Sequence, residues 1–498
     1  MIENLNKKIA IGYLWNLASK WITRFIGIIS TLILVRVLNP IDFGIATLAN
    51  IVMTLFVMLA EVGTDKYVIK SQSCTNELLN SAWSLNIALK LGCGLFIALL
   101  SFYVADFIHE PLLTNVLLVC SVIPVIGALK NVGLLNYERE LNYRPLTQLS
   151  VLVKLTVFPI TIGLALWLKS YWALVIGTLM SEVITVLGSY WIHPYRPKWS
   201  SRQWSEQWHF SKWMVVSTTT GYLRSRLDAF LLGRFLPSNA VGLYRVSQEF
   251  AWLPFSELIA PATRSFYAGL TQLIDDKEAL TCQLCRYLAL AYLLVVPSAA
   301  GIYVLQDEIV SVVMGEKWAD AAPVLGLLSL LMLSMPLNIA LQSLLTHMSK
   351  LSYLVWIDVI MIVAIGASFS LLYQQGITLL ATYTLARVAL VVVFIALLLL
   401  VYKAVLHVAL TRVLAVLLLP MLPSGVMYAV VALLKSALAF NPLLNLLILA
   451  VVGMAMFIPL MVLLIWGAKA WIPEYQYVLE LLANVRNAVL KNRVTSQS

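Results

Sequence analysis

The sequence predicts an all-α integral membrane protein with about fourteen transmembrane helices. Apolar stretches follow one another from end to end of the 498-residue chain, and a helix needs about 20 such residues to cross a hydrocarbon core. Hydrophobic residues make up 61% of the chain and charged residues only 12%, whereas a soluble domain carries about 25% charge. Because backbone groups in lipid need internal partners and no alternating strand pattern is present, we expect helices rather than a barrel.

Hydropathy places the spans, with the longest polar segments at about 193–209, about 264–283 and from 468 onward. No cleavable signal peptide is expected, because the first apolar segment is too long for one and lacks a small-residue cleavage site. The predicted spans are 9–36, 43–63, 82–104, 112–134, 146–168, 171–192, 210–233, 241–263, 284–305, 321–345, 352–373, 377–402, 409–434 and 443–467.

Lys and Arg in the loops predict the orientation, since short cytoplasmic loops carry an excess of them. With the N-terminus in the cytoplasm, the cations of the loops and of the adjoining span ends divide 21 to 5 in favour of the cytoplasmic side. A miscounted span would scramble this asymmetry, so the division supports fourteen spans and places both termini inside. The net charge of +10 is dispersed over the cytoplasmic segments as a topology signal, which argues against nucleic acid as a partner.

A short internal repeat divides the chain, and six predicted spans separate its two copies. An even number keeps both halves in the same orientation, as in transporters built from parallel repeats. We expect an N-lobe over 1–205, a C-lobe over 206–405, spans 13 and 14 over 406–470, and a cytoplasmic tail over 471–498, with a central cavity between the lobes. The matching residues, each 198 positions apart, are Arg36 and Arg234, Leu38 and Leu236, and Gly44 and Gly242.

Ionisable side chains within the spans mark the candidate site, because charge in the hydrocarbon region is costly and by default suggests function. Spans 1 and 7 each carry a polar stripe at helical spacing, and Arg226 lies off the second stripe. Spans 2 and 8 are also polar on one side, so we expect these four spans to line a water-filled cavity. The candidate substrate-binding residues are Lys20, Arg24, Asn50, Arg224, Arg245 and Gln248.

Cations in such a cavity favour an anion, and diphosphate is a natural one because guanidinium groups bind phosphate oxygens bidentately. In the competing structural interpretation, Lys20 and Arg24 extend to the membrane interface and Arg224 only neutralises Asp228. No catalytic residue, cofactor or metal site is expected, and Na⁺ or H⁺ is the candidate coupling ion, with Thr382 and Thr384 as hydroxyl ligands suited to Na⁺. The candidate ion-coupling carboxylates are Asp228, Asp358, Glu249 and Glu61.

Several short segments carry a resemblance to a known family, and they are 12–15, 35–38, 43–44, 228–234, 242–244, 314–318 and 322–325. From about residue 8 to about 460, the chain resembles the polysaccharide-transporter branch of the multidrug/oligosaccharidyl-lipid/polysaccharide exporter superfamily, the Wzx-type flippases. Within that branch it is similar to colanic-acid-exporter-like lipopolysaccharide biosynthesis proteins.

This resemblance implies the two-lobed transporter fold of the superfamily and a transporter rather than an enzyme. The implied substrates are undecaprenyl-diphosphate-linked oligosaccharide repeat units of O-antigen, capsule or exopolysaccharide. They would cross to the periplasmic leaflet of a bacterial inner membrane by alternating access, coupled to an ion gradient or to the membrane potential. The implied partners are the lipid-linked oligosaccharide and the bilayer, with the polymerase and chain-length components of the same pathway.

Two alternatives stay open. A multidrug exporter of the same superfamily would favour an acidic cavity for cationic drugs, and the basic stripe of span 1 argues against it. A membrane polymerase or ligase of polysaccharide assembly typically has a large external loop or a D-x-D motif, and the chain has neither. An ATP-driven pump is excluded, because the chain contains no Gly-Lys dipeptide and hence no P-loop.

Overall fold

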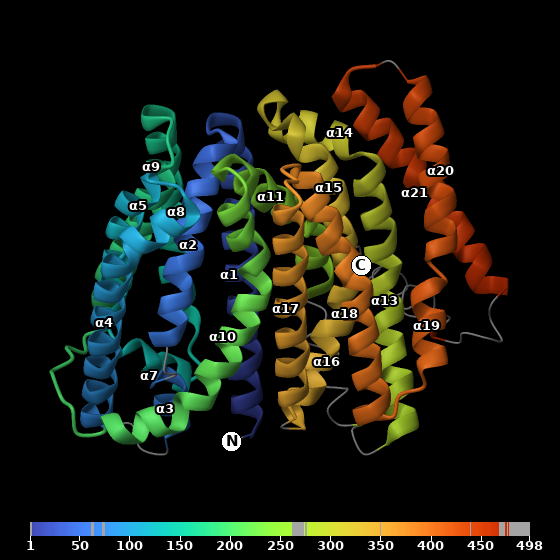
Figure 1. Cartoon of the computed structure of the whole chain (residues 1–498). Helices are drawn as coiled ribbons and strands as arrows, with labels where there is room; N and C mark the ends of the chain where they lie inside the picture. Colours follow the sequence, from blue (N-terminus) through green and yellow to red (C-terminus); the bar gives the residue numbers. More distant parts are fainter. Residues whose placement is uncertain are drawn as a thin grey trace, which may run out of the picture. The chain divides into compact units, whose positions relative to one another are not determined.

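The fold comes from a computed structural model of the chain, which describes residues 2–60, 64–71, 75–260, 273, 276–348, 350–438, 440–467, 474, 475 and 477. These residues form helices and short turns, and no β-strand occurs among them (Figure 1). The predicted all-α class is therefore confirmed.

The chain divides into two compact units, Met1–Arg245 and Val246–Ser498. This division does not coincide with the predicted lobe boundary at 205, because α10 and the start of α11 pack with the first unit. The predicted lobes therefore stay a prediction. The helices of the first unit are α1 (Ile2–Val37), α2 (Pro40–Ala60), α3 (Thr64–Lys70), α4 (Asn76–Ile108), α5 (Leu112–Cys120), α6 (Val122–Ala128), α7 (Leu134–Arg139), α8 (Arg144–Leu168), α9 (Trp172–Ile192), α10 (Trp204–Phe235) and the beginning of α11 (Ser238–Ala251).

The second unit begins within α11 and is helical throughout its described residues. Its elements are the π-helical turn η1 (Phe255–Ile259), α13 (Lys277–Val304), α14 (Gln306–Ile309), η2 (Val310–Met314), η3 (Glu316–Ala321), α15 (Ala322–Ser329), η4 (Leu330–Ser334), α16 (Met335–His347), α17 (Ser352–Gln374), α18 (Leu380–Leu406), α19 (Leu410–Leu418), α20 (Met421–Ala437) and α21 (Pro442–Gly467).

Ten helical segments among the described residues are long and apolar enough to cross a membrane, so the chain is a multi-pass membrane protein. A shorter apolar stretch covers Leu112–Ala128. The remaining three predicted spans fall on α1, on α10, and on α11 with η1, which carry the polar stripes and are therefore less apolar. The count of fourteen stays a prediction.

Proline divides several helices that hydropathy predicts as continuous. The predicted span 112–134 is divided into α5 and α6, because Pro124 has no N–H to donate to the carbonyl of Cys120, and its helical part ends at Ala128. For the same reason the predicted span 241–263 changes from α11 to the π-helical turn η1 beside Pro254, and the span 409–434 is divided into α19 and α20 at Pro420.

The internal repeat of the sequence recurs in the helix boundaries. α1 ends at Val37 and α2 begins at Pro40, and α10 ends at Phe235 and α11 begins at Ser238. Both ends and both beginnings are 198 residues apart, so each copy of the repeat forms the same turn between two helices.

The segment 193–203, which links α9 to α10, is bound along the beginning of α4. The side-chain oxygen of Asn80 accepts hydrogen bonds from the hydroxyl of Tyr195 at 2.8 Å and from the backbone nitrogen of Lys198 at 2.7 Å. One half-buried side chain on α4 thus holds two points of the linking segment. This attachment fixes where α10, which contributes to the candidate site, begins.

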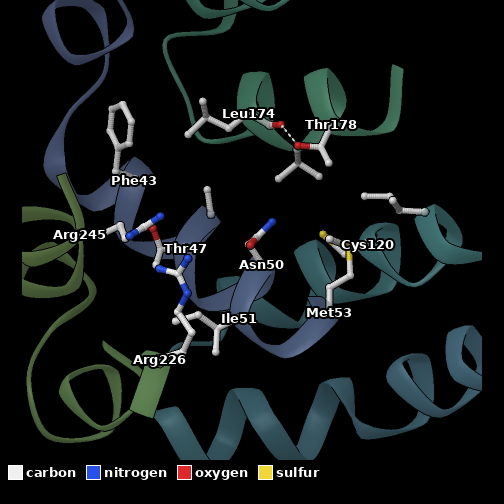
Figure 2. Close-up of a pocket in the computed structure, with 13 residues that line it drawn as sticks. Phe43, Thr47, Asn50, Ile51, Met53, Cys120, Leu174, Thr178, Arg226 and Arg245 are labelled. Carbon is white, nitrogen blue, oxygen red and sulfur yellow. Dashed lines mark hydrogen bonds between the residues drawn. The ribbon is translucent and has the colours of Figure 1, made fainter. Parts of the chain in front are cut away.

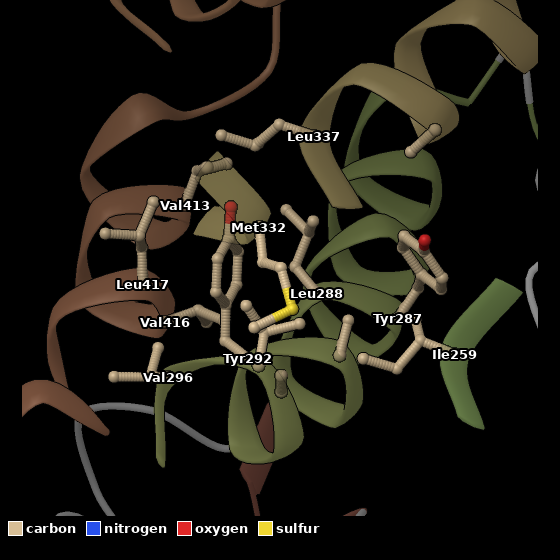
Figure 3. Packing of buried hydrophobic residues seen from close by; sticks show 14 of the residues in the cluster. Ile259, Tyr287, Leu288, Tyr292, Val296, Met332, Leu337, Val413, Val416 and Leu417 are labelled. Atoms are coloured by element: carbon tan, nitrogen blue, oxygen red, sulfur yellow. The ribbon is translucent and has the colours of Figure 1, made fainter. Parts of the chain in front are cut away.

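A large apolar core fills the second unit and is centred on α13 (Figure 3). The buried hydroxyl of Tyr292 donates to the carbonyl oxygen of Leu333 at 2.8 Å, and that of Tyr402 donates to the carbonyl oxygen of Leu337 at 2.8 Å. Both acceptors lie where η4 passes into α16. The two phenols therefore satisfy carbonyl groups at a change of helix geometry, where a buried group without a partner would be costly.

Candidate functional site

A cavity of about 240 Å³ lies within the first unit, beside the first half of α2 (Figure 2). Its wall is built from α2, α5, α6, α9, α10 and α11. The lining residues are Phe43, Ala46, Thr47, Asn50, Ile51, Met53, Cys120, Ile123, Leu174, Val175, Thr178, Arg226 and Arg245.

Two arginines give this cavity its charge. Arg226 comes from α10 and Arg245 from α11, and Figure 2 shows both guanidinium groups near the side chain of Thr47 on α2. Asn50 adds an amide one turn further along α2. The lining residues that the structure describes include no carboxylate, and a guanidinium group stays charged at any physiological pH. The cavity is therefore suited to an anion.

The packing of α10 on α2 explains why Arg226 reaches the cavity. The hydroxyl of Tyr222 on α10 donates to the carbonyl oxygen of Ile51 on α2 at 3.1 Å. Arg226 lies one turn after Tyr222, and residues four apart share one face of a helix. The face of α10 that meets α2 thus carries Arg226 to the wall formed by Thr47 and Asn50.

A buried hydrogen bond joins the two helices that carry the arginines. Asp228 on α10 is only 2% exposed, and its carboxylate accepts from the hydroxyl of Tyr244 on α11 at 2.7 Å. It also accepts from the backbone nitrogen of Ala229 at 2.8 Å. Arg226 and Arg245 stand two residues before Asp228 and one residue after Tyr244, so this bond fixes their relative position.

The structure brings together two of the predicted substrate-binding residues, Asn50 and Arg245, and adds Arg226, which the predicted stripe excluded. Arg224, which lies on that stripe, is half-buried and is not among the lining residues. The sequence shows that α10 has a polar face, but it does not show which face of α10 meets α2. The hydrogen bond from Tyr222 to α2, which only the structure shows, identifies that face.

The predicted cations of α1 lie elsewhere in the first unit. Lys20 is exposed and Arg24 is half-buried, and neither lines the cavity of Figure 2. The expectation that span 1 contributes to a substrate cavity stays a prediction.

The other predicted site residues are spread over the second unit or lie outside the described residues. Gln248 is buried on α11 and Glu249 beside it is half-buried. Asp358 is half-buried on α17. Glu61 lies outside the described residues. None of those described lines the cavity.

The structure does not bring Asp358 near the hydroxyls proposed to complete a sodium site with it. α17 and α18 are antiparallel neighbours, and the rings of Phe369 and Tyr383 pack edge to face with centroids 5.2 Å apart. Asp358 precedes Phe369 by three turns, about 16 Å along the helix at 1.5 Å per residue. Thr384, next to Tyr383, donates its hydroxyl to the carbonyl oxygen of Leu380 at 2.9 Å.

No group of three or more His, Cys, Asp or Glu side chains with metal-binding geometry occurs in the part of the chain that the structure describes. The polar groups that converge on the cavity are guanidinium, amide and hydroxyl groups. The charged groups among the described lining residues are the two guanidinium groups, and these bind an anion such as phosphate rather than a cation.

Comparison with known proteins gives sequence relatives in polysaccharide assembly. The chain is 24% identical to an uncharacterized membrane protein in the cps region of Klebsiella pneumoniae, over 63% of this chain and 66% of that protein. It is 23% identical to lipopolysaccharide biosynthesis protein WzxC of Escherichia coli K12, over 65% and 67% of the two chains. It is also 23% identical to succinoglycan biosynthesis transport protein ExoT of Rhizobium meliloti, over 64% of each. The aligned region thus spans about two thirds of the length of these relatives.

Solved structures with the same fold are membrane transporters. The lipid II flippase MurJ, in an inward closed conformation, matches with a TM-score of 0.73 and 12% identity, over 91% of this chain and 99% of MurJ. An inward-facing multidrug resistance transporter of the MATE family matches with a TM-score of 0.57 and 12% identity, over 76% and 92%. These likenesses confirm the predicted transporter fold.

The family is shown by a match over more than half of the chain. Residues 33–323 match the family model described as polysaccharide biosynthesis protein. This region includes α2, α10 and α11 and therefore the whole cavity. The predicted resemblance is confirmed, and the chain belongs to the polysaccharide biosynthesis protein family of membrane transporters.

Proposed function

We propose that this protein is a flippase that moves undecaprenyl-diphosphate-linked oligosaccharide repeat units across the bacterial inner membrane. The units would pass from the cytoplasmic to the periplasmic leaflet by alternating access, with both termini of the chain in the cytoplasm. The family match, relatives named for lipopolysaccharide and succinoglycan biosynthesis, and the fold shared with the lipid II flippase MurJ support this proposal.

The observation that carries the proposal is the pair of guanidinium groups beside Thr47 and Asn50. Arg226 and Arg245 enter one cavity from two helices, and two guanidinium groups can share the oxygens of a diphosphate through bidentate hydrogen bonds. The cavity of about 240 Å³ is smaller than the roughly 300–1,000 Å³ of sites that enclose a drug-sized ligand. It therefore suits the diphosphate group, with the sugars and the polyprenyl chain outside it.

The two alternative functions fit this cavity less well. A multidrug exporter that takes cationic drugs needs carboxylates in its site, and the described lining residues include two arginines and no carboxylate. A polymerase or ligase needs groups that perform chemistry on the sugar. Arginine, asparagine and threonine side chains bind and orient a phosphate group but do not perform chemistry on a sugar. A transporter needs only such binding groups.

Na⁺ or H⁺ remains the proposed coupling ion. Of the candidate carboxylates, Asp228 is the one bound to the helices that carry the cavity arginines, through Tyr244. A change in its charge would act directly on the position of Arg245. The proposed partners are the lipid-linked oligosaccharide, the bilayer, and the polymerase and chain-length components of the same pathway.

Binding of undecaprenyl diphosphate to the purified full chain in lipid nanodiscs tests the proposal. Arg226→Ala combined with Arg245→Ala should weaken binding by about 10-fold or more, because each charged hydrogen bond contributes about 1.5–3 kcal/mol. Lys154→Ala is the matched control, since Lys154 is an exposed cation on α8. Equal binding by the double variant and the wild type would refute the proposed role of the cavity.

A further inference from the structure

α2 and α11 cross at two glycines, where their backbones touch directly. A methyl group added at Gly44 would overlap the carbonyl oxygen of Ser238, and one added at Gly242 would overlap the carbonyl oxygen of Pro40. The two overlaps are equivalent, because Ser238 and Gly242 follow Pro40 and Gly44 by the repeat distance of 198. The first turns of the two helices therefore pack against each other about a local two-fold axis.

A crossing of this kind depends on close approach and is held by weak contacts. Backbones that touch at glycine interact through Cα–H···O contacts, which are weaker than ordinary hydrogen bonds. Gly44 and Gly242 themselves have no side chain to unpack when the helices move apart. A single added methyl group, on the other hand, is enough to keep the crossing from closing.

The turn between α10 and α11 is also held from a second side. The hydroxyl of Ser238 donates to the carboxylate of Glu110, which lies just after α4, at 2.5 Å. The guanidinium group of Arg234 lies 5.2 Å from the ring centroid of Phe107 at the end of α4. Ser238 thus contacts Gly44 through its carbonyl group and Glu110 through its hydroxyl, so one residue belongs to both contacts.

The cavity of Figure 2 begins beside this crossing. Phe43 adjoins Gly44 on α2, and Arg245 lies one turn after Gly242 on α11, and both line the cavity. Cys120 on α5 also lines it and is only 5% exposed. The crossing therefore stands between the arginine cavity and the end of the unit at which the α1–α2 and α10–α11 turns lie.

We propose that the Gly44–Gly242 crossing, with the Ser238–Glu110 hydrogen bond as its latch, is a gate that closes this end of the arginine cavity. The role of this gate rests on the proposed function, because a bound phosphate group has to leave past this end. The experiment that tests the gate does not depend on that function. Parting of the crossing would expose the wall on which Cys120 lies, whether or not a substrate is moved.

Labelling of Cys120 by a membrane-impermeant maleimide tests the gate. The full-length protein would carry serine at its four other cysteines, Cys74, Cys93, Cys282 and Cys285, and labelling would be followed in spheroplasts and in inverted vesicles. Gly44→Ala and Gly242→Ala should each raise the labelling rate of Cys120 by about 10-fold from one face of the membrane only. That rise is expected because the added methyl group cannot coexist with the opposite carbonyl oxygen.

Gly27→Ala and Gly163→Ala are the matched controls. Each also replaces a glycine within a helix by alanine, but a methyl group at Gly27 or Gly163 meets nothing within 4 Å. Labelling should not change in these controls. An unchanged rate in correctly inserted Gly44→Ala and Gly242→Ala, or an equal rise in the controls, would overturn the gate.

Ser238→Ala provides a second test that adds no volume, in case the glycine variants fail to fold. It removes the hydrogen bond to Glu110 and leaves the glycine contacts in place, so the labelling rate of Cys120 should rise by about 3-fold. An unchanged rate would overturn the role of Ser238 as the latch. Because labelling needs no substrate, a failed gate is distinguishable from a failed flippase assignment, which diphosphate binding reports.

Discussion

The hydroxyl of Tyr244 donates to the carboxylate of Asp228 at 2.7 Å, and both residues are buried. This bond connects α10 and α11 at the level where Arg226 and Arg245 enter the cavity. A carboxylate so placed has two possible roles, which are to hold the arginine-bearing helices in register and to change charge during transport. From the sequence alone we expect the second role or a counter-ion of Arg224, because nothing in the sequence pairs Tyr244 with Asp228.

Tyr244→Phe should reduce the stability of the protein by about 2 kcal/mol, because a buried carboxylate loses a hydrogen bond. It should also weaken diphosphate binding, since Arg245 follows Tyr244 directly. Chemical denaturation of the detergent-solubilised protein measures the first effect, and nanodisc binding measures the second. Tyr103→Phe is the control, because Tyr103 is 75% exposed on α4. Stability equal to that of the control would contradict a structural role for the bond.

Asp228→Asn separates the positioning role from ion coupling. If Asp228 couples transport to an ion, the variant should insert stably but its flipping should no longer respond to pH or sodium gradients. If Asp228 only positions the helices, the variant should resemble Tyr244→Phe under every gradient. If it is instead a counter-ion of Arg224, neutralising Arg224 as well should restore transport. The measurement is flipping of a fluorescent lipid-linked sugar in proteoliposomes with imposed gradients.

His193, at the end of α9, should make the stability of the first unit depend on pH. Burial lowers the pKa of His193 below its ordinary value of 6.5, an effect that Arg196 reinforces and Glu140 opposes. Its Nδ1 accepts a hydrogen bond from the backbone nitrogen of Tyr195 at 3.1 Å. The unfolded chain therefore binds a proton at this site before the folded chain does, and stability should fall as the pH drops below about 6.5.

The variant His193→Gln checks this pH dependence. It keeps a side-chain acceptor but cannot be protonated, so the loss of thermal stability between about pH 7.5 and about pH 5.5 should be smaller than in the wild type. His347→Gln is the control, since His347 is exposed at the end of α16. The same loss in wild type and His193→Gln would show that His193 does not contribute.

Much of the fold could be predicted because its signals are local. Helical class, the repeat and the turns at Pro40 and Ser238 follow from apolar runs and from residues that end and begin helices. Contacts between helices could not be predicted in this way. The repeat identified Gly44 and Gly242 but not that they touch each other, and the stripe rule excluded Arg226 because the sequence does not reveal which face of α10 packs on α2.

The break at Pro124 and the separation of Asp358 from Thr384 show the same limit. Hydropathy depends on apolar residues alone and is insensitive to the missing N–H of Pro124. The residues of α5 and α6 are therefore predicted as one span. Asp358, Thr382 and Thr384 are three residues that suit sodium and lie in neighbouring helices. Only the antiparallel register of the two helices, visible in the Phe369–Tyr383 contact, decides whether they meet.

Topology is the prediction that rests most directly on the sequence. The 21-to-5 division of cations in the loops and adjoining span ends places the C-terminus in the cytoplasm and the 306–320 segment in the periplasm. An alkaline phosphatase fusion within 306–320 should therefore be active, and one after residue 498 should be inactive, with green fluorescent protein fusions giving the opposite pattern. If the fusions at both positions reported the same side of the membrane, the fourteen-span arrangement would be wrong.

Variants of Lys20 and Arg24 test whether the arginine cavity of α2, α10 and α11 is the whole anion site. Both lie on one stripe of α1, which the sequence predicts to face a substrate, but neither lines the cavity. If they hold the diphosphate at another stage of transport, Lys20→Ala with Arg24→Ala should abolish polymer export in cells while leaving diphosphate binding in nanodiscs within about 3-fold of wild type. Arg24→Lys should also impair export, because a bidentate group becomes a point charge.

Arg226→Ala with Arg245→Ala should lose both polymer export and diphosphate binding. This contrast would assign the arginine pair of the cavity and the Lys20–Arg24 pair to different steps of transport. Protein levels in the membrane serve as the control for insertion of each variant. Normal export by the Lys20 and Arg24 double variant would remove α1 from the substrate path and leave the cavity arginines as the anion site. Loss of binding in that variant would instead place all four cations at one site, in a conformation where α1 closes on the cavity.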